Sequence, residues 1–132
     1  MTIRLLLVDD DAPVRMALRM LLESDGDLEV VGEAGNGADA LAMAEQLDPD
    51  IILMDIQMPE MDGIEATRRI SEKMSGDEGP RVLVLTTFEQ DEYLSQALQA
   101  GASGFLLKRM PADELIARIK AVAAPNVTHR RQ

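Results

Sequence analysis

Acidic residues follow two short apolar segments of this sequence, and their spacing is the first indication of chemistry. Asp9, Asp10 and Asp11 follow the first apolar segment, and Asp55 follows the third. Carboxylates held close together repel one another unless a cation lies among them. Ligands that are all oxygen favour a hard divalent cation, Mg²⁺ or Mn²⁺, with coordination left for a phosphoryl oxygen. An aspartate can itself be the nucleophile that carries a phosphoryl group.

Further polar groups follow the fourth and fifth apolar segments. Thr86, with Thr87 beside it, would supply a hydroxyl donor, and Lys108 would supply a positive charge. Phosphoryl transfer needs such positioning and charge neutralisation more than covalent machinery. Each residue alone has an ordinary explanation, since a threonine often packs or caps and a lysine is usually solvated. Their joint placement favours a phosphoryl site, whereas we expect Asp11 to cap a helix or to face solvent.

The elements that must position these residues follow from the apolar pattern, which alternates between short continuous runs and runs with helical periodicity. The predicted strands cover residues 3–8, 28–34, 51–54, 82–85 and 105–107. The second of them is less apolar, so we expect it at an edge of the sheet. The predicted helices contain residues 14–22, 37–47, 62–74, 93–98 and 115–122.

Residues that begin or end helices agree with this division. Asn36 is a predicted N-cap, and Asp62 with Glu65 has the spacing of a capping box. Gly101 is expected to end the fourth helix. Pro125 lies beyond the expected end of the fifth helix, so that helix is predicted to stop before it.

Five strand–helix units indicate an α/β domain whose parallel sheet is covered by helices on both faces. With right-handed crossovers, the sequence predicts a flavodoxin-like (βα)5 doubly wound sheet, with five parallel strands in order 2-1-3-4-5. Ligands of such sheets bind outside the carboxyl ends of the strands, where the polar residues above are expected. The domain should cover residues 1–124, with 125–132 as a C-terminal tail or the start of a linker.

Composition excludes several classes of function. The 132 residues include 24 acidic and 13 basic side chains, and the formal net charge of −11 argues against direct contact with nucleic acid or an anionic membrane. There is no cysteine, and His129 is the only histidine, which argues against thiol chemistry and multi-histidine metal sites. No segment has the apolar length of a membrane span, and the acidic N-terminal region is unlike a signal peptide, so we expect a cytoplasmic protein.

The stretch around Asp55 is the most specific motif in the chain, and residues 54–63 read MDIQMPEMDG. It is accompanied along the chain by Asp9, Asp10, Thr86 and Lys108. Together these residues resemble the receiver domain of two-component response regulators, over residues 3–123. Smaller segments resemble the NarL/LuxR-type subfamily of transcriptional regulators; they are residues 31–37, 85–88 and 101–108.

The resemblance implies a phosphorylation site and a metal site. Asp55 would accept a phosphoryl group from a sensor histidine kinase. Asp10, Asp55 and the backbone carbonyl of Gln57 would bind Mg²⁺, or Mn²⁺ in its place, and Asp9 would act through a water molecule. The protein would then be a signalling phosphoacceptor that assists its own phosphorylation and dephosphorylation, rather than an enzyme.

The resemblance also implies how the phosphoryl group is read. Thr86, the backbone N–H of Thr87 and the side chain of Lys108 would hold phosphoryl oxygens. Thr86 and Phe105 would form the switch, with the aromatic ring turning inward as Thr86 moves toward the phosphoryl group. One departure stands beside this site, because many family members have proline or aspartate where Arg109 follows the lysine.

The output expected from the resemblance is transcription. Members of the subfamily usually continue into a helix-turn-helix domain, so DNA would be bound by a C-terminal domain missing from this chain, with no direct contact by the receiver. A homodimer is a further expectation. A receiver that acts alone is the alternative, and the linker-like residues 125–132 favour the longer regulator.

Two other functions stay open at this point. A phosphatase of the haloacid-dehalogenase type also uses a strand-end aspartate, but its first strand is followed by Asp-x-Asp-x-Thr or Val, whereas here Asp11 is followed by Ala12-Pro13. The other alternative is a receiver that no longer uses phosphate and serves as a docking or dimerisation module. Turnover of a phosphate ester would identify the first, and an oligomeric state unchanged by Asp55→Asn would identify the second.

Overall fold

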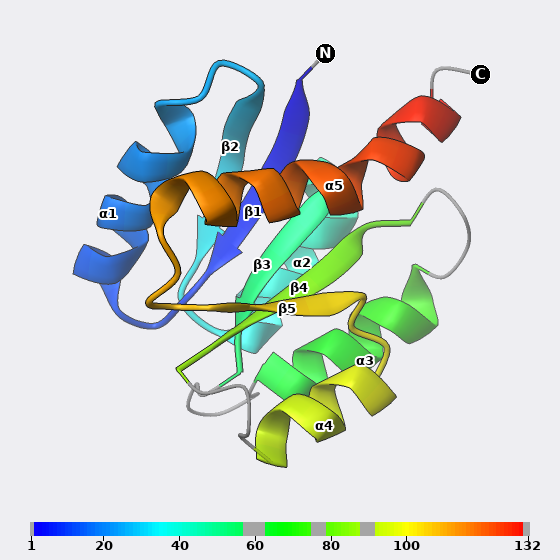
Figure 1. Ribbon diagram of the computed structural model, residues 1–132. Helices are drawn as coiled ribbons and strands as arrows, with labels where there is room; N and C mark the ends of the chain where they lie inside the picture. Colours follow the sequence, from blue (N-terminus) through cyan, green and yellow to red (C-terminus); the bar gives the residue numbers. More distant parts are fainter. Residues whose placement is uncertain (1, 57–62, 75–78, 88–91, 131–132) are drawn as a thin grey trace.

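The computed structural model describes residues 2–56, 63–74, 79–87 and 92–130, with the backbone alone for 124–130. Within these ranges strands and helices alternate along the chain (Figure 1). The strands are β1 (Ile3–Val8), β2 (Leu28–Ala34), β3 (Ile51–Asp55), β4 (Arg81–Thr86) and β5 (Gly104–Leu107). The helices are α1 (Ala12–Glu23), α2 (Gly37–Leu47), α3 (Gly63–Lys73), α4 (Glu92–Gln99) and α5 (Ala112–Arg130).

The described strands form one parallel sheet in the order β2-β1-β3-β4-β5, which confirms the predicted doubly wound topology. The three central strands are almost entirely buried, as their continuous apolar runs require. β2 lies at one edge, as its weaker apolar pattern predicted, and β5 lies at the other.

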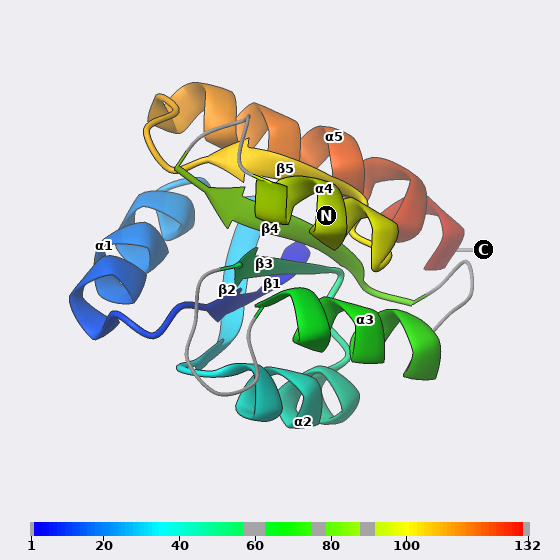
Figure 2. The ribbon, with the colours of Figure 1, turned by 90° about the horizontal axis from the view of Figure 1, so that it is seen from below.

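Alternate residues of each strand point to opposite faces of the sheet, and each face has its own apolar core. On one face Leu6, Ile52 and Val84 pack against α2, α3 and α4. On the other face Leu5 and Leu53 pack against α1 and α5. Figure 2 shows the same two layers on either side of the sheet. This burial on both faces holds the central strands, and therefore the residues at their carboxyl ends, in a rigid frame.

Helix ends are largely as the sequence predicted. The Asn36 side chain accepts a hydrogen bond from the Asp39 backbone N–H at 2.8 Å and caps α2. Gly101 follows α4 with a φ of +118°, a conformation that favours glycine. Asp62 lies outside the described residues, whereas Glu65 is in the first turn of α3 and pairs with Arg68 and Arg69.

The predicted end of the last helix before Pro125 is wrong, because α5 continues to Arg130. A proline has no backbone N–H to donate, and its ring clashes with the carbonyl group four residues earlier. These two effects usually end or bend a helix. Its fixed φ is nevertheless helical, so a helix can continue through it at the expense of that one hydrogen bond.

Candidate functional site

The acidic residues meet at the carboxyl edge of the sheet, because β1 and β3 are adjacent and parallel. Val8 lies opposite Met54 in the register, so Asp9 and Asp55 come next on both strands. Both carboxylates are buried, with 3% and 4% of each residue exposed. The neighbouring Asp10 is exposed and opens the group toward solvent.

One carboxylate oxygen from each of Asp9, Asp10 and Asp55 lies within 4.8 Å of the other two. Asp9 Oδ1 accepts a hydrogen bond from the Asp11 backbone N–H at 2.9 Å. Asp9 Oδ2 is buried and accepts no hydrogen bond from any residue that the structure describes. Buried carboxylate oxygens require a partner, and three converging carboxylates are the donor set of a hard divalent cation. The residues therefore fit Mg²⁺ or Mn²⁺.

Lys108 brings a positive charge to the same group. Its Nζ lies 3.5 Å from Asp55 Oδ1 and 4.0 Å from Asp9 Oδ2. The Lys108 backbone N–H donates to the Thr86 carbonyl at 2.9 Å, which extends the β4–β5 ladder by one bond and fixes the start of the side chain. The side chain remains 37% exposed, so its ammonium reaches the acidic residues from the solvent side.

Thr86 is the last residue of β4 and is 2% exposed, whereas Thr87 is exposed. β4 lies between β3 and β5, so Thr86 stands at the carboxyl edge between Asp55 and Lys108. The structure thus brings together five of the residues that the sequence singled out, which are Asp9, Asp10, Asp55, Thr86 and Lys108.

Asp11 does not belong to this group. Its side chain accepts a hydrogen bond from the Val14 backbone N–H at 3.2 Å and caps α1, as predicted. Gln57, the predicted backbone ligand, lies outside the described residues, as do 58–62 of the family motif.

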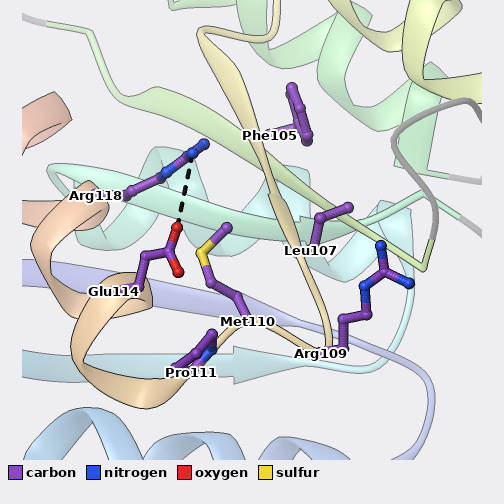
Figure 3. A pocket seen from close by; sticks show the side chains of 7 residues that line it. All are labelled: Phe105, Leu107, Arg109, Met110, Pro111, Glu114 and Arg118. Carbon is purple, nitrogen blue, oxygen red and sulfur yellow. Dashed lines mark ion pairs between the residues drawn. The ribbon is translucent and has the colours of Figure 1, made fainter.

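Phe105 lies on β5, which β4 separates from the strand that ends in Asp55. It is half-buried and packs against the apolar core under α2, α3 and α4. It also lines a shallow pocket between β5 and the start of α5, together with Arg109 and Met110 (Figure 3). At its far side Arg118 pairs with Glu114 at 4.0 Å. Arg109, the departure from the family pattern, therefore adds a cation to this pocket.

Sequence reasoning missed Arg15. Its guanidinium donates to the backbone carbonyl of Asp9 at 2.6 Å and to Glu33 of β2 at 3.2 Å. The available signal was its place in the first turn of the helix that follows the acidic run, where an arginine can reach back to the strand end. Glu33 is far away in sequence, so the sequence alone did not indicate that Arg15 pairs with Glu33.

Each helix in the described part of the chain is too short or too polar to span a lipid bilayer. A family model described as "Response regulator receiver domain" matches residues 5–120. The transcriptional regulatory protein LiaR of Bacillus subtilis is 44% identical over 121 residues, which cover 92% of this chain and 56% of LiaR. The response regulator protein VraR of Staphylococcus aureus is 42% identical over 115 residues, with 87% and 54% covered. The chain thus spans about half the length of the curated relatives that it matches.

Solved structures agree with this similarity. The receiver domain of the response regulator NarL from Mycobacterium tuberculosis superposes with a TM-score of 0.85 and 32% identity, covering 93% of this chain and 97% of that one. The response regulator domain of Thermotoga maritima CheB gives a TM-score of 0.84 and 35% identity, covering 94% and 98%. The matched family, the strand order and the acidic residues at the carboxyl edge lead to one conclusion: this chain belongs to the family of response regulator receiver domains.

Proposed function

We propose that Asp55 accepts a phosphoryl group from a sensor histidine kinase and that the chain is a phosphorylation-controlled switch. The observation that carries this proposal is the position of the Asp55 carboxylate, buried at a strand end among two other carboxylates and 3.5 Å from the Lys108 ammonium. Such a group has the nucleophile, the cation ligands and the positive charge that phosphoryl transfer to a carboxylate requires.

The proposed reaction needs little covalent machinery. An Asp55 carboxylate oxygen attacks the phosphorus of a phosphohistidine, a P–O bond forms, and the P–N bond breaks with its electron pair going to the imidazole nitrogen. A Mg²⁺ ion bound by Asp10 and Asp55, by the Gln57 carbonyl and through water by Asp9 would neutralise charge on the phosphoryl oxygens. Lys108 pairs with one phosphoryl oxygen.

The proposed readout starts at the carboxyl end of β4. The Thr86 hydroxyl and the Thr87 backbone N–H donate to the new phosphoryl oxygens, which draws the end of β4 toward Asp55. Phe105, half-buried on the neighbouring strand, then turns further inward. The phosphoryl group thereby favours one of two arrangements of the face formed by α4, β5 and α5, and partners that prefer it are recruited.

The proposed partners follow from the relatives, two of which are named as a transcriptional regulatory protein and a response regulator. A histidine kinase would supply the phosphoryl group, and a homodimer would form after phosphorylation. In the whole regulator, residues 1–124 would be the receiver and 125–132 the start of the connection to a DNA-binding domain. Such a protein works in the cytoplasm and controls transcription.

The test is intact mass after incubation with a small-molecule phosphodonor and Mg²⁺. Wild type should gain one phosphoryl group, and hydroxylamine should remove it because it is an acyl phosphate. Asp55→Asn should gain none, whereas Asp27→Asn, at an exposed position away from the site, should label like wild type. Size-exclusion chromatography of the same samples tests dimerisation.

Two labelling results would contradict the proposal. Labelling of the Asp55→Asn variant would assign the acceptor elsewhere. The second result is a well-folded wild type that gains no mass under conditions in which a control receiver does. That result would favour a docking or dimerisation module that does not use phosphate. Steady turnover of a chromogenic phosphate ester would instead indicate a phosphatase.

A further inference from the structure

Arg15 connects the acidic site to the edge strand of the sheet. One guanidinium nitrogen donates to the backbone carbonyl of Asp9 at 2.6 Å, and Nε donates to Glu33 Oε1 at 3.2 Å. The side chain is 19% exposed, which is low for an arginine near the surface. The second carboxylate oxygen of Glu33 accepts a hydrogen bond from Arg19 at 2.7 Å.

The carbonyl that Arg15 holds belongs to the peptide bond between Asp9 and Asp10. This peptide is planar, so its orientation decides where the side chains on either side of it begin. The Asp9 backbone N–H is already held by the Ala34 carbonyl at 3.1 Å, the last bond of the β1–β2 ladder. The hydrogen bond from Arg15 fixes the same residue at its carbonyl end, where the ladder has stopped.

The charge of the arginine is balanced locally. Hydrogen bonds from Arg19 and Arg15 hold the pKa of the Glu33 carboxyl below its ordinary value, although burial acts in the opposite direction. Glu33 is therefore ionised at neutral pH and neutralises part of the positive charge beside it. Arg15 can thus orient the Asp9–Asp10 peptide without strongly repelling a cation bound by the carboxylates.

We propose that Arg15, held in place by Glu33, is a positioning residue that sets the divalent-cation affinity of the acidic site. The inference rests on the proposed function, because that function supplies the cation. Residues that orient metal ligands through hydrogen bonds commonly contribute factors of about 10 to 100 in metal affinity. Arg15 acts through the backbone, because its hydrogen bond holds the carbonyl of the peptide that joins Asp9 to Asp10.

The test measures the Mg²⁺ dissociation constant of the whole chain by titration, followed through backbone amide NMR shifts and without a phosphodonor. Arg15→Ala should weaken Mg²⁺ binding about tenfold. Arg15→Lys should recover part of the loss, because one ammonium can reach either the Asp9 carbonyl or Glu33. Arg19→Ala is the matched control, since Arg19 shares Glu33 but donates no hydrogen bond to Asp9.

Several outcomes would overturn the inference. One is an Arg15→Ala variant that binds Mg²⁺ as tightly as wild type. Another is an Arg19→Ala variant that loses as much Mg²⁺ affinity as Arg15→Ala, because that result would indicate a general effect on the packing of α1. If Arg15→Ala does not fold, the Mg²⁺ affinities of Glu33→Gln and Arg15→Lys test the inference in its place. Wild-type affinity in both variants would refute the positioning role of Arg15.

The proposed function fails in a different way. A wild type that neither binds Mg²⁺ nor gains a phosphoryl group refutes the proposed function itself. A wild type that does both, alongside Arg15 variants of unchanged affinity, refutes only the role of Arg15.

Discussion

Lys108 Nζ lies 3.5 Å from Asp55 Oδ1, although β4 separates the strands to which the two residues are attached. The lysine side chain therefore spans the width of one strand above the carboxyl edge of the sheet. Its charge reduces the repulsion between Asp55 and Asp9, which are both buried. This relationship has consequences for the stability of the protein without a bound cation.

Replacing Lys108 by methionine should destabilise the protein in the presence of EDTA by about 1 kcal/mol, because the ammonium is partly exposed. Excess Mg²⁺ should restore most of that loss, since a bound cation replaces the missing charge and stabilises the folded state by mass action. Urea unfolding with EDTA and with Mg²⁺ measures both effects. Lys73→Met is the control, because its pair with Glu45 is exposed and far from the carboxylates. Equal behaviour of the two variants would contradict the prediction.

Gly63 begins α3 directly against the end of β3, the strand that carries Asp55. A Cβ added there would overlap the carbonyl oxygen of Asp55 and lie 2.6 Å from Ile56 Cα, and both are backbone atoms. Gly63→Ala should therefore destabilise the fold by about 2–3 kcal/mol and lower phosphorylation of Asp55. Gly26→Ala, where the added group meets no atom within 4 Å beyond the adjacent residues, should change stability by less than about 0.5 kcal/mol. Urea unfolding of both variants checks this, and equal stabilities would show that α3 can move away without cost.

Glu33 should make stability depend on pH in the acid range. Hydrogen bonds from Arg19 and Arg15 lower its pKa from an ordinary value of 4.5, so the folded state favours the ionised carboxyl. The stabilisation is complete above pH 4.5 and is lost as the pH falls through the lowered pKa. Glu33→Gln should thus be less stable than wild type by about 1 kcal/mol at pH 7, with a difference that shrinks below pH 4.5. A gap that stayed constant from pH 7 to about pH 3 would exclude this origin.

Thr86→Val should separate phosphorylation from its readout. Valine keeps the shape of this buried side chain but removes the hydroxyl, so Asp55 should still gain a phosphoryl group while the response of Phe105 is lost. The chain has two phenylalanines, so fluorophenylalanine labelling would give two ¹⁹F resonances, and Phe105→Leu assigns them. The Phe105 resonance should shift on phosphorylation in wild type and remain in place in Thr86→Val. The same shift in both proteins would remove Thr86 from the switch.

Much of the fold was predictable from local sequence. The five apolar runs and the helical periodicities between them are properties of neighbouring residues, and each of the ten predicted elements is found in the described ranges. The strand order followed from right-handed crossovers and the length of the chain. The last helix was the exception: Pro125 is a strong local signal for a helix end, but α5 continues through it.

The amino-acid sequence by itself determined which residues could form the site, because carboxylates, a threonine and a lysine follow four strands that end at one edge. Asp11 was already expected to cap a helix, but only the tertiary structure distinguished a buried Asp9 from an exposed Asp10. Strand register buries Asp9 beside Asp55, Asp10 remains exposed, and the start of α1 takes Asp11 as its cap. The link from Arg15 to Glu33 also needed the fold, since 18 residues separate the two in the chain and only the packing of α1 on β2 brings them into contact.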